Sequence, residues 1–477
     1  MNLPQHGLDR QTIFATLRAY KQHDVNWRSG KLLAGVYDPG DDNAATIKEA
    51  YTEFLTENAL FLNFYPSVIQ LENDVTRMVI NLLQGDANAV GNCTSGGTES
   101  IMLSVKAARD WARAERKITA PEMIVPITAH AAFHKAAHYL GCKIIITPVN
   151  PQTFRADVNA MQAAITPNTI LLVGSAPCYA QGVIDPIGEI AALAQSHKIL
   201  CHVDACVGGI HLSIMRKLGY PLPAFDFSVP GVTSISTDMH KYGYAAKNIS
   251  VAMFRHDHLR KFAMFACANT ASYAVLNPSV LSTRSAGPMA GAWAALMSFG
   301  EAGYADMVQR VQTCTADMIA AVNATPGLRI LGQPAMSMFA IASDEINIFD
   351  LDDEMAARGW MLQPQFSTPD LPANLHAGVH WGNVAHVGAF AADLQAAVSA
   401  CRAKAVTTEA AHGLKNQVLQ LLQQPLSPQV FGQLLQLGGL TPGQLPTGFG
   451  RINTVLDMLP RDLVNVLLVE YMNSIYR

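Results

Sequence analysis

Short apolar runs alternate with amphipathic stretches through the middle of the chain. The runs EMIVPIT, KIIITPV, TILLVGS, KILCHVDA and SISTDMH have the length and composition of strands. Between them, HKAAHYLG, NAMQAAI and PIGEIAALAQSH have the spacing of helices. This alternation predicts an α/β domain with a mainly parallel sheet, in which functional residues follow the strands at one edge.

The flanking segments predict three parts. Residues 1–60 read as a helical N-terminal segment broken by VYDPGDD. Residues 61–300 hold the large α/β domain, which opens with an amphipathic helix over residues 67–84. Residues 301–477 contain SMFAIAS, WMLQPQF and finally DLVNVLLVEYMNSIY, which predict a smaller α+β C-terminal domain with a helical tail.

Composition and charge exclude several classes of protein. The net charge is −4 and no long basic run occurs, so nucleic acid is not an expected partner. The N-terminus lacks the features of a signal peptide, and the longest uncharged stretch, 158–184, contains Asn, Gln, Pro and Gly. We therefore expect no transmembrane anchor. Eight cysteines without a secretion signal fit a reducing cytoplasm, and the sequence leaves delivery to a host cell open.

A glycine-rich turn, SGGTES from Ser95 to Ser100, opens a predicted helix. Backbone amides at a helix N-terminus attract an anion, and glycine lets a phosphate approach closely. Thr98 and Ser100 could add hydroxyl donors. An ordinary glycine turn with a Thr/Ser cap explains the pattern equally well when it is taken alone.

An acidic residue, Asp204, ends the apolar strand in HVDAC. A buried carboxylate needs a cationic or donor partner, and a protonated pyridine nitrogen is one such partner. The simpler interpretation is a helix N-cap. Cys201, His202 and Cys206 lie close enough to suggest a metal site, but no second ligand pair has suitable spacing, so no metal is expected.

Two further groups follow strands. Lys241, in HKYGY, could form a Schiff base through a partly neutral amine, although a lone lysine there is usually a surface residue. His130, in AHAAFHKAA, could stack on a flat ring. A phosphate turn, a stacking histidine, an acid for a pyridine nitrogen and a lysine, in that order, are what a fold-type I enzyme needs to bind pyridoxal 5′-phosphate (PLP).

These motifs resemble those of the sphingosine-1-phosphate lyases, in the group II decarboxylase-like branch of PLP enzymes. The likeness extends from LPQHGL and VNWRSGK to FGEAGY and is densest at CTSGGTES, AHAAFHKAA, GVIDP, HVDACVGG, GVTSIS and HKYGY. The resemblance implies the PLP-dependent transferase fold of type I, with a seven-stranded sheet in the large domain, and a homodimer with active sites near the subunit interface.

The resemblance also implies roles for single residues. Lys241 matches the Schiff-base lysine, Asp204 the partner of the pyridine nitrogen and His130 the ring-stacking residue. The matches to cofactor-phosphate contacts are Gly96, Gly97, Thr98 and His240. The matches to substrate-phosphate or catalytic groups are Tyr65, in NFYPSV, Lys247, in YGYAAK, and Arg284, in STR where the family has GSR.

The implied reaction is a retro-aldol cleavage of a phosphorylated long-chain base such as sphingosine 1-phosphate. A base removes the proton of the C3 hydroxyl, the C2–C3 bond breaks, and C2 is protonated. The products are phosphoethanolamine and a long-chain aldehyde. Lys241, Lys247, a tyrosine or the substrate phosphate could be the base, and the sequence does not choose among them.

Two departures from the family pattern lie on the substrate side. Gln181 stands where the family has a histidine before the glycine of GVIDP, and TASYAV, Thr270–Val275, replaces a Trp-x-Gly-Gly-x-Tyr stretch. Two alternatives therefore stay open: a PLP-dependent amino-acid decarboxylase of the same branch, and a non-catalytic PLP-binding relative.

Overall fold

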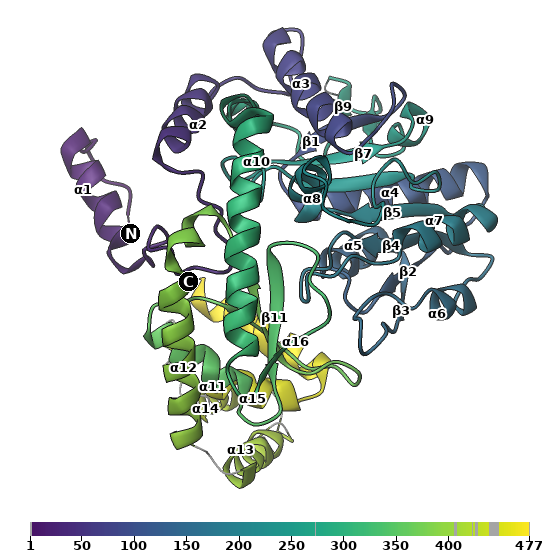
Figure 1. Ribbon diagram of the computed structural model, residues 1–477. Coiled ribbons are helices and arrows are strands. Elements are labelled where there is room, and N and C mark those ends of the chain that lie inside the picture. Colours follow the sequence, from purple (N-terminus) through teal and green to yellow (C-terminus); the bar gives the residue numbers. More distant parts are fainter. Residues whose placement is uncertain are drawn as a thin grey trace.

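The computed structural model describes residues 2–476 except 272, 405–407, 422, 425–427 and 438–447. Its large domain is built on a seven-stranded sheet of order β1-β7-β6-β5-β4-β2-β3 (Figure 1). Its strands are β1 (Val90–Thr94), β2 (Glu122–Pro126), β3 (Lys143–Thr147), β4 (Thr169–Ser175), β5 (Leu200–Asp204), β6 (Ser234–Asp238) and β7 (Ser250–Phe254).

Only β7 runs antiparallel to its neighbours, so the predicted mainly parallel, fold-type I sheet is confirmed. The five predicted strands are β2 to β6. Strands β1 and β7 were not predicted, because VGNCT has glycine and asparagine in place of a β-branched run and SVAMF contains a single β-branched residue.

Helices cover both faces of this sheet. They are α3 (Pro66–Leu82), α4 (Gly97–Glu115), α5 (Ala132–Leu140), α6 (Val158–Ala163), α7 (Ile187–Ser196), α8 (Gly208–Lys217) and α9 (Asp257–Arg260). Along β4, Leu172 belongs to the core on one face, and Leu171 and Val173 belong to the core on the other. Because side chains alternate along a strand, a strand buried on both faces reads as a continuous apolar run.

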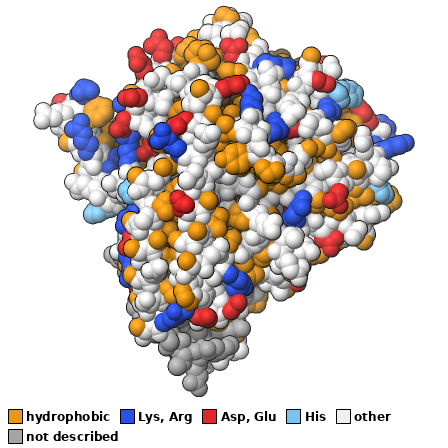
Figure 2. All heavy atoms as spheres, viewed as in Figure 1, with side chains coloured by type: hydrophobic (Ala, Val, Ile, Leu, Met, Phe, Trp, Pro, Cys, Tyr) orange, Lys and Arg blue, Asp and Glu red, His pale blue; other side chains and the backbone are white. Residues whose placement is uncertain are grey.

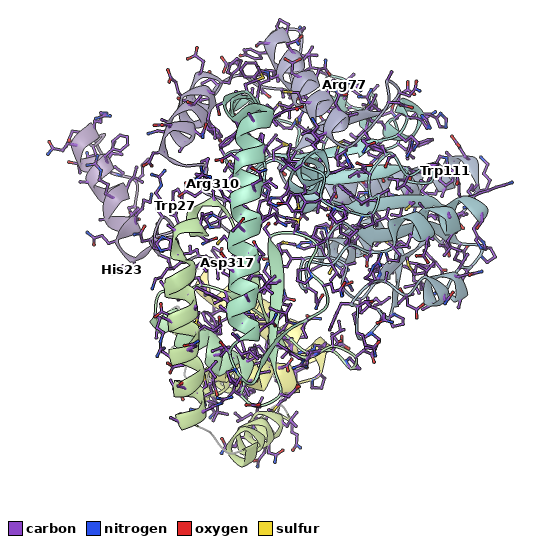
Figure 3. The ribbon with its side chains drawn as sticks, in the orientation of Figure 1. His23, Trp27, Arg77, Trp111, Arg310 and Asp317 are labelled. Atoms are coloured by element: carbon purple, nitrogen blue, oxygen red, sulfur yellow. The ribbon has the colours of Figure 1, made fainter. Side chains whose placement is uncertain are left out.

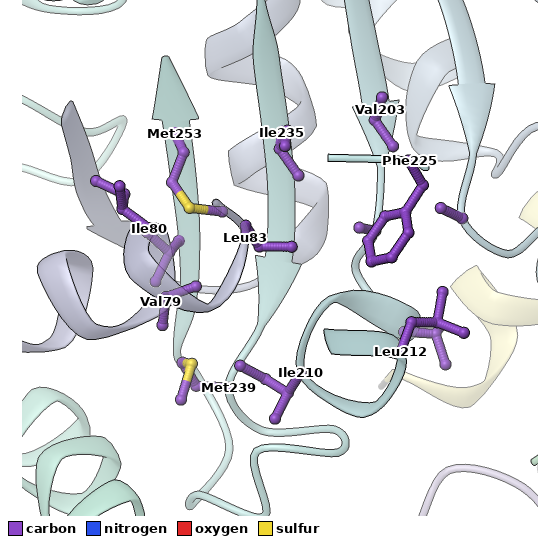
Figure 4. Packing of buried hydrophobic residues seen from close by; sticks show 14 of the residues in the cluster. Val79, Ile80, Leu83, Val203, Ile210, Leu212, Phe225, Ile235, Met239 and Met253 are labelled. Atoms are coloured by element: carbon purple, nitrogen blue, oxygen red, sulfur yellow. The ribbon is translucent and has the colours of Figure 1, made fainter. Parts of the chain in front are cut away.

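The core between the sheet and helices α3 and α8 is closely packed. Figure 4 shows strand residues facing helix residues across it, and the labelled residues include Met253, Ile235, Val203, Ile210, Leu212, Val79, Ile80 and Leu83. All of these are at most 2% exposed. This packing fixes the strands whose ends carry the site.

A long helix, α10 (Gly287–Asn323), connects the two domains and breaks at Gly300, where φ is +55°. Its first part packs on α2 (Asp41–Glu53) and α3, and its second part packs on the smaller domain (Figure 1). Arg310, labelled in Figure 3, lies over the ring of Trp381 at 5.4 Å.

The smaller domain has an antiparallel sheet of order β10-β11-β13-β12. Its strands are β10 (Leu328–Ile330), β11 (Met338–Ser343), β12 (Gln363–Gln365) and β13 (Asn374–Gly378). The helices against it are α11 (Ile348–Ala357), η2 (Trp381–His386) and α12 (Val387–Lys404). Within the described chain, the stretch Trp381–Ala403 is long and apolar enough to cross a membrane, and its Phe390 and Leu394 are fully buried in the core of this domain.

The N-terminal segment contributes to both domains. Leu33 is buried in the core of the smaller domain and Ile47 in that of the large one. By contrast, α1 (Arg10–Tyr20), followed by η1 (Lys21–His23), buries no residue and projects from the body (Figure 1). Figure 3 places His23 and Trp27 where this arm joins the rest of the molecule.

The last helices attach to the smaller domain, and a hairpin extends the large one. The helices are α13 (Thr408–Leu421), α14 (Pro428–Leu437), α15 (Gly450–Met458) and α16 (Arg461–Ile475), and the hairpin strands are β8 (Phe265–Cys267) and β9 (Val275–Asn277). Asp353 of α11 accepts hydrogen bonds from the backbone amides of Phe449 and Gly450, which anchors the start of α15.

Candidate active site

A cavity of about 340 Å³ lies where the parallel strands of the large sheet end. Five strands contribute to its lining, because the carboxyl ends of parallel strands meet at one edge of a sheet. The lining includes Ser95, Gly96, Gly97 and Thr98 after β1, His130 after β2, Ser175 of β4, Asp204 and Cys206 at β5, and Asp238, His240 and Lys241 at β6. The structure thus brings together every cofactor-binding residue predicted from the sequence.

The glycine turn leads from β1 into α4. Gly96 has a φ of +154°, and a Cβ on Gly97 would lie 2.8 Å from both carboxylate oxygens of Asp238 and from Cys206 Sγ. Glu99 Oε2 accepts hydrogen bonds from Ser95 N at 2.6 Å and from Ser95 Oγ at 2.7 Å, and so holds the turn in shape. The first amides of α4 have no intrahelical acceptor, so this turn can bind an anion.

Asp204 ends β5 and is 8% exposed. Its Oδ1 accepts hydrogen bonds from Cys206 N at 3.0 Å and from Ser236 Oγ at 3.3 Å, which leaves Oδ2 for a ligand. Burial alone would raise the pKa of this carboxyl, but His130 and the Cys206 donors bring it below its usual value. The group therefore stays ionised at neutral pH and can pair with a cation in the cavity.

Lys241 Nζ lies 3.0 Å from Asp238 Oδ2, and the side chain of Asp238 is 2% exposed. Burial would lower the pKa of the Lys241 amine, but the Asp238 carboxylate outweighs it and raises that pKa above its usual value. Asp238 Oδ1 has no hydrogen-bond partner among the described residues. A buried oxygen without a partner beside the glycine turn indicates that a polar ligand completes this site.

Two histidines border the cavity. His130 Nδ1 accepts a hydrogen bond from Ala132 N at 3.1 Å, and its side chain is exposed at the cavity wall. His240 Nδ1 accepts one from Ile249 N at 3.3 Å, and its Nε2 lies 3.6 Å from Asp238 Oδ2. Burial lowers the pKa of His240, so this ring is neutral at pH 7.

The three residues predicted for the substrate side do not line this cavity within one chain. Arg284, 8% exposed, donates hydrogen bonds to Cys93 O at 2.9 Å and to Glu72 Oε2 at 3.3 Å, so it supports the strand before the glycine turn. Tyr65 stands at the start of α3, half-buried. Lys247 Nζ donates to Gly35 O at 3.1 Å and lies 5.3 Å from the ring centre of Tyr37.

Four residues at or beside the cavity were not predicted from the sequence to belong to the cofactor site. Asp238 and Cys206 contact the glycine turn, and Asp238 was visible as an acid at the end of the run SISTDMH. Tyr179 lines the cavity, and its hydroxyl donates to Gln363 Oε1 at 2.6 Å. Tyr37 lies between Lys247 and Tyr242, and no local pattern marks it because its role depends on tertiary packing.

The departures from the family pattern have different surroundings. Gln181 is 1% exposed, and its Oε1 accepts a hydrogen bond from Cys178 Sγ at 3.5 Å. The stretch 270–275 lies in the hairpin between β8 and β9, with residue 272 outside the described chain, and Tyr273 is 55% exposed. Tyr273, the tyrosine within this stretch, is not among the residues that line the cofactor cavity.

The cysteines considered as metal ligands are free thiols, and His202 between them is occupied. Its Nδ1 lies 2.9 Å from Ser234 Oγ and its Nε2 lies 3.2 Å from Ser236 Oγ. Burial lowers the pKa of His202 to about 4. Among the described residues, no group of three or more His, Cys, Asp or Glu side chains could hold a metal ion.

Comparisons with known proteins identify the family. The "Pyridoxal-dependent decarboxylase conserved domain" matches residues 2–340, and the "Pyridoxal-dependent enzyme, C-terminal putative HTH domain" matches residues 392–474. The sphingosine-1-phosphate lyase of Oryza sativa subsp. japonica is 40% identical over 409 residues, which cover 84% of this chain and 75% of the relative. This chain belongs to the sphingosine-1-phosphate lyase family.

Solved structures agree with this assignment. The sphingosine-1-phosphate lyase of Burkholderia pseudomallei matches with a TM-score of 0.81 and 36% identity, over 89% of this chain and 98% of that one. A glutamate decarboxylase of Lactobacillus brevis matches with a TM-score of 0.74 at 19% identity, over 84% of this chain and 95% of that one, and so shows the shared fold alone. The cofactor of the family is PLP.

The cavity of this lyase fits PLP in size and chemistry. Its volume of about 340 Å³ lies within the usual range of small-molecule sites. Gly97 leaves open the space that a Cβ would fill, beside amides that can bind a phosphate. The ionised Asp204 suits a pyridinium nitrogen, and Lys241 supplies an amine at the same strand edge.

The contact between Lys241 and Asp238 predicts how this lyase takes up its cofactor. An amine must be neutral to add to an aldehyde, and PLP carries one. In the cofactor-free protein, the raised pKa keeps Lys241 protonated at neutral pH, so the rate at which added PLP becomes attached should rise with pH. Asp238→Asn should lower this pKa, move the profile to lower pH and speed attachment at pH 7, about tenfold for each unit of pKa lost.

Absorbance of the attached cofactor after mixing measures this rate. The raised pKa of Lys241 also stabilises the cofactor-free fold at neutral pH, and this contribution is lost as the pH rises through that raised pKa. Asp344→Asn, which removes an exposed carboxylate remote from the cavity, is the matched control. Identical pH profiles for wild type and Asp238→Asn would show that Asp238 does not control the amine.

Proposed function

We propose that the chain cleaves phosphorylated long-chain bases such as sphingosine 1-phosphate into phosphoethanolamine and a long-chain aldehyde, using Lys241 and Asp204 on its PLP. The enzyme is a PLP-dependent lyase of the sphingosine-1-phosphate lyase family. The observation that carries the residue roles is the convergence of the glycine turn, His130, Asp204 and Lys241 on one cavity.

Each residue has a distinct task in this proposal. PLP, when bound, supplies an electron sink for the pair released from the broken bond. The amides of Gly96, Gly97 and Thr98 bind its phosphate, and His130 packs against its ring. Asp204, ionised by its surroundings, would keep the pyridine nitrogen of the cofactor protonated. Lys241 would hold the cofactor covalently through Nζ, and its amine, which lines the same cavity, could move a proton during the reaction.

The substrate side needs charge for a phosphate and a base for the C3 hydroxyl. Lys247 supplies a cation, and its pKa is lowered by partial desolvation and by the like charge of Lys241. Tyr37 and Tyr179 supply hydroxyls near Asp238 and Lys241, and burial raises the pKa of both. A phenol can remove the proton of the C3 hydroxyl only in its ionised form, which a neighbouring cation favours. Lys247, which lies over the ring of Tyr37, is placed to provide that positive charge.

A product assay tests the lyase proposal directly. Purified PLP-loaded protein is incubated with sphinganine phosphate, and phosphoethanolamine and the aldehyde are measured together. Equal amounts of both products are expected. Lys241→Ala should lose covalent attachment of PLP, seen as failure of borohydride to fix the cofactor, and essentially all turnover. Release of carbon dioxide from an amino acid without cleavage of sphinganine phosphate would assign the chain to the decarboxylases instead.

We also propose that the active enzyme is a homodimer in which the second copy covers the cavity edge. Helix α1 projects without burying any residue, and Figure 2 shows hydrophobic and basic side chains on this arm. Its exposed apolar residues include Ile13, Phe14 and Leu17. Val280 is exposed too, and its backbone amide donates to Glu99 of the glycine turn. Further exposed apolar residues are Phe61, Phe64, Leu276 and Leu281.

Sedimentation at micromolar concentration tests the dimer. The wild type should sediment as a dimer, because the second copy would cover the apolar residues of α1 and the exposed apolar residues around Val280. Removal of residues 2–20 should weaken the association at least tenfold. Phe14→Ser with Leu17→Ser changes the same apolar face without shortening the chain. A wild-type monomer that cleaves substrate at the full rate would contradict this proposal.

A further inference from the structure

A second cavity, of about 260 Å³, adjoins the cofactor cavity. His130 and Tyr179 line both, so the two spaces are neighbours across these rings. The second cavity lies between the loop after β2, the segment around Gln181 and the smaller domain. The side chains that matter here are Thr128, Gln181, Gln365, Phe366, Leu371 and Asn374.

Buried polar atoms in this cavity have no partner in the described chain. Asn374 is 2% exposed, its Nδ2 donates to Pro372 O at 3.1 Å, and its Oδ1 has no hydrogen-bond partner among the described residues. Thr128 Oγ1 is likewise buried and unpartnered there. Because buried polar groups are nearly always hydrogen-bonded, these oxygens indicate a ligand group that can donate and accept.

The lining is uncharged. No carboxylate, lysine or arginine side chain lines it, and burial raises the pKa of the Tyr179 hydroxyl. Besides His130, the polar side chains are amides and the hydroxyls of Thr128, Thr368 and Tyr179. The walls between them are apolar and include Ile127, Phe366 and Leu371. A phosphate or carboxylate would find no lysine or arginine to pair with here. An aliphatic segment that carries a hydroxyl would find apolar walls for its carbons and hydrogen-bonding groups for its oxygen.

The wall between the two cavities is held in place. Tyr179 stacks on His376 with ring centres 4.1 Å apart and donates its hydroxyl to Gln363 Oε1 at 2.6 Å. A substrate whose amine end is at Lys241 therefore has the second cavity directly beside it, bordered by the same His130 and Tyr179 side chains. Its volume is below the usual range for a whole small-molecule ligand, so it suits a few carbons and one polar group.

We propose that this cavity is a subsite for a hydroxylated part of the substrate chain, with Asn374 Oδ1 accepting from the hydroxyl and Thr128 Oγ1 bonding beside it. The inference rests on the proposed function and adds to it a preference for 4-hydroxy long-chain bases, which carry a hydroxyl next to the carbon that becomes the aldehyde. Gln181, where the family has a histidine, keeps the subsite uncharged.

The test compares kcat/KM of the PLP-loaded enzyme for 4-hydroxysphinganine phosphate and for sphinganine phosphate. The wild type should prefer the hydroxylated substrate about fivefold, as expected for one neutral buried hydrogen bond. Asn374→Leu should reduce the ratio to about one, by lowering only the value for the hydroxylated substrate. Thr128→Val, which keeps the side-chain shape and removes an oxygen without a protein partner, should lower the ratio about twofold.

Asn92→Leu is the matched control. Asn92 is 8% exposed and also has an unpartnered Oδ1, but it lies in β1, outside the subsite, so its variant should keep the wild-type ratio. Equal kcat/KM for both substrates in the wild type would overturn the subsite, as would a preference that survives both Asn374→Leu and Thr128→Val. Cleavage of neither substrate would instead refute the proposed function itself.

Discussion

Burying ionised groups at one edge of a parallel sheet is the constraint on which this structure depends. Asp204, Asp238 and Lys241 lie at the ends of β5 and β6, where an unpaired charge would cost several kcal/mol. Lys241 and Asp238 form an ion pair, whereas Asp204 is kept ionised by the nearby His130, by hydrogen-bond donors and by the charge of Lys241. Among the described residues Asp204 forms no ion pair of its own, and a buried carboxylate in this state is the group that PLP requires.

The surrounding elements keep that edge rigid. Glu99 fixes the glycine turn, and Arg284 with Glu72 fixes β1 just before it. The two cavities then divide the chemistry between them. The one at the strand ends contains the charges, and the one behind His130 and Tyr179 is neutral. A substrate with a charged head and a long chain matches this division in polarity.

The sequence predicted what depends on local pattern. Strands β2 to β6 are apolar runs, and Asp204 and Lys241 lie at or just after the ends of two of them, so their convergence follows from the parallel sheet. The glycine turn was recognised from its own residues, although the strand before it, β1, was not predicted. Other features depend on contacts between distant segments. Tyr37 reaches the site through the N-terminal segment, and Asn374 comes from the smaller domain, so no local spacing could reveal either. The pairing of Arg284 with Glu72 also depends on tertiary contacts. The family resemblance had instead placed Arg284 among the substrate-binding residues.

The most direct test of the account is the turnover of Asp204→Asn with sphinganine phosphate, compared with wild type at equal PLP occupancy. The variant keeps the size of the side chain and removes its charge, while the glycine turn and Lys241 still hold the cofactor. We expect turnover to fall about a hundredfold or more, which corresponds to a loss of ~3 kcal/mol of transition-state stabilisation. A variant that turns over at the wild-type rate would show that Asp204 only caps the strand end and would contradict the central claim.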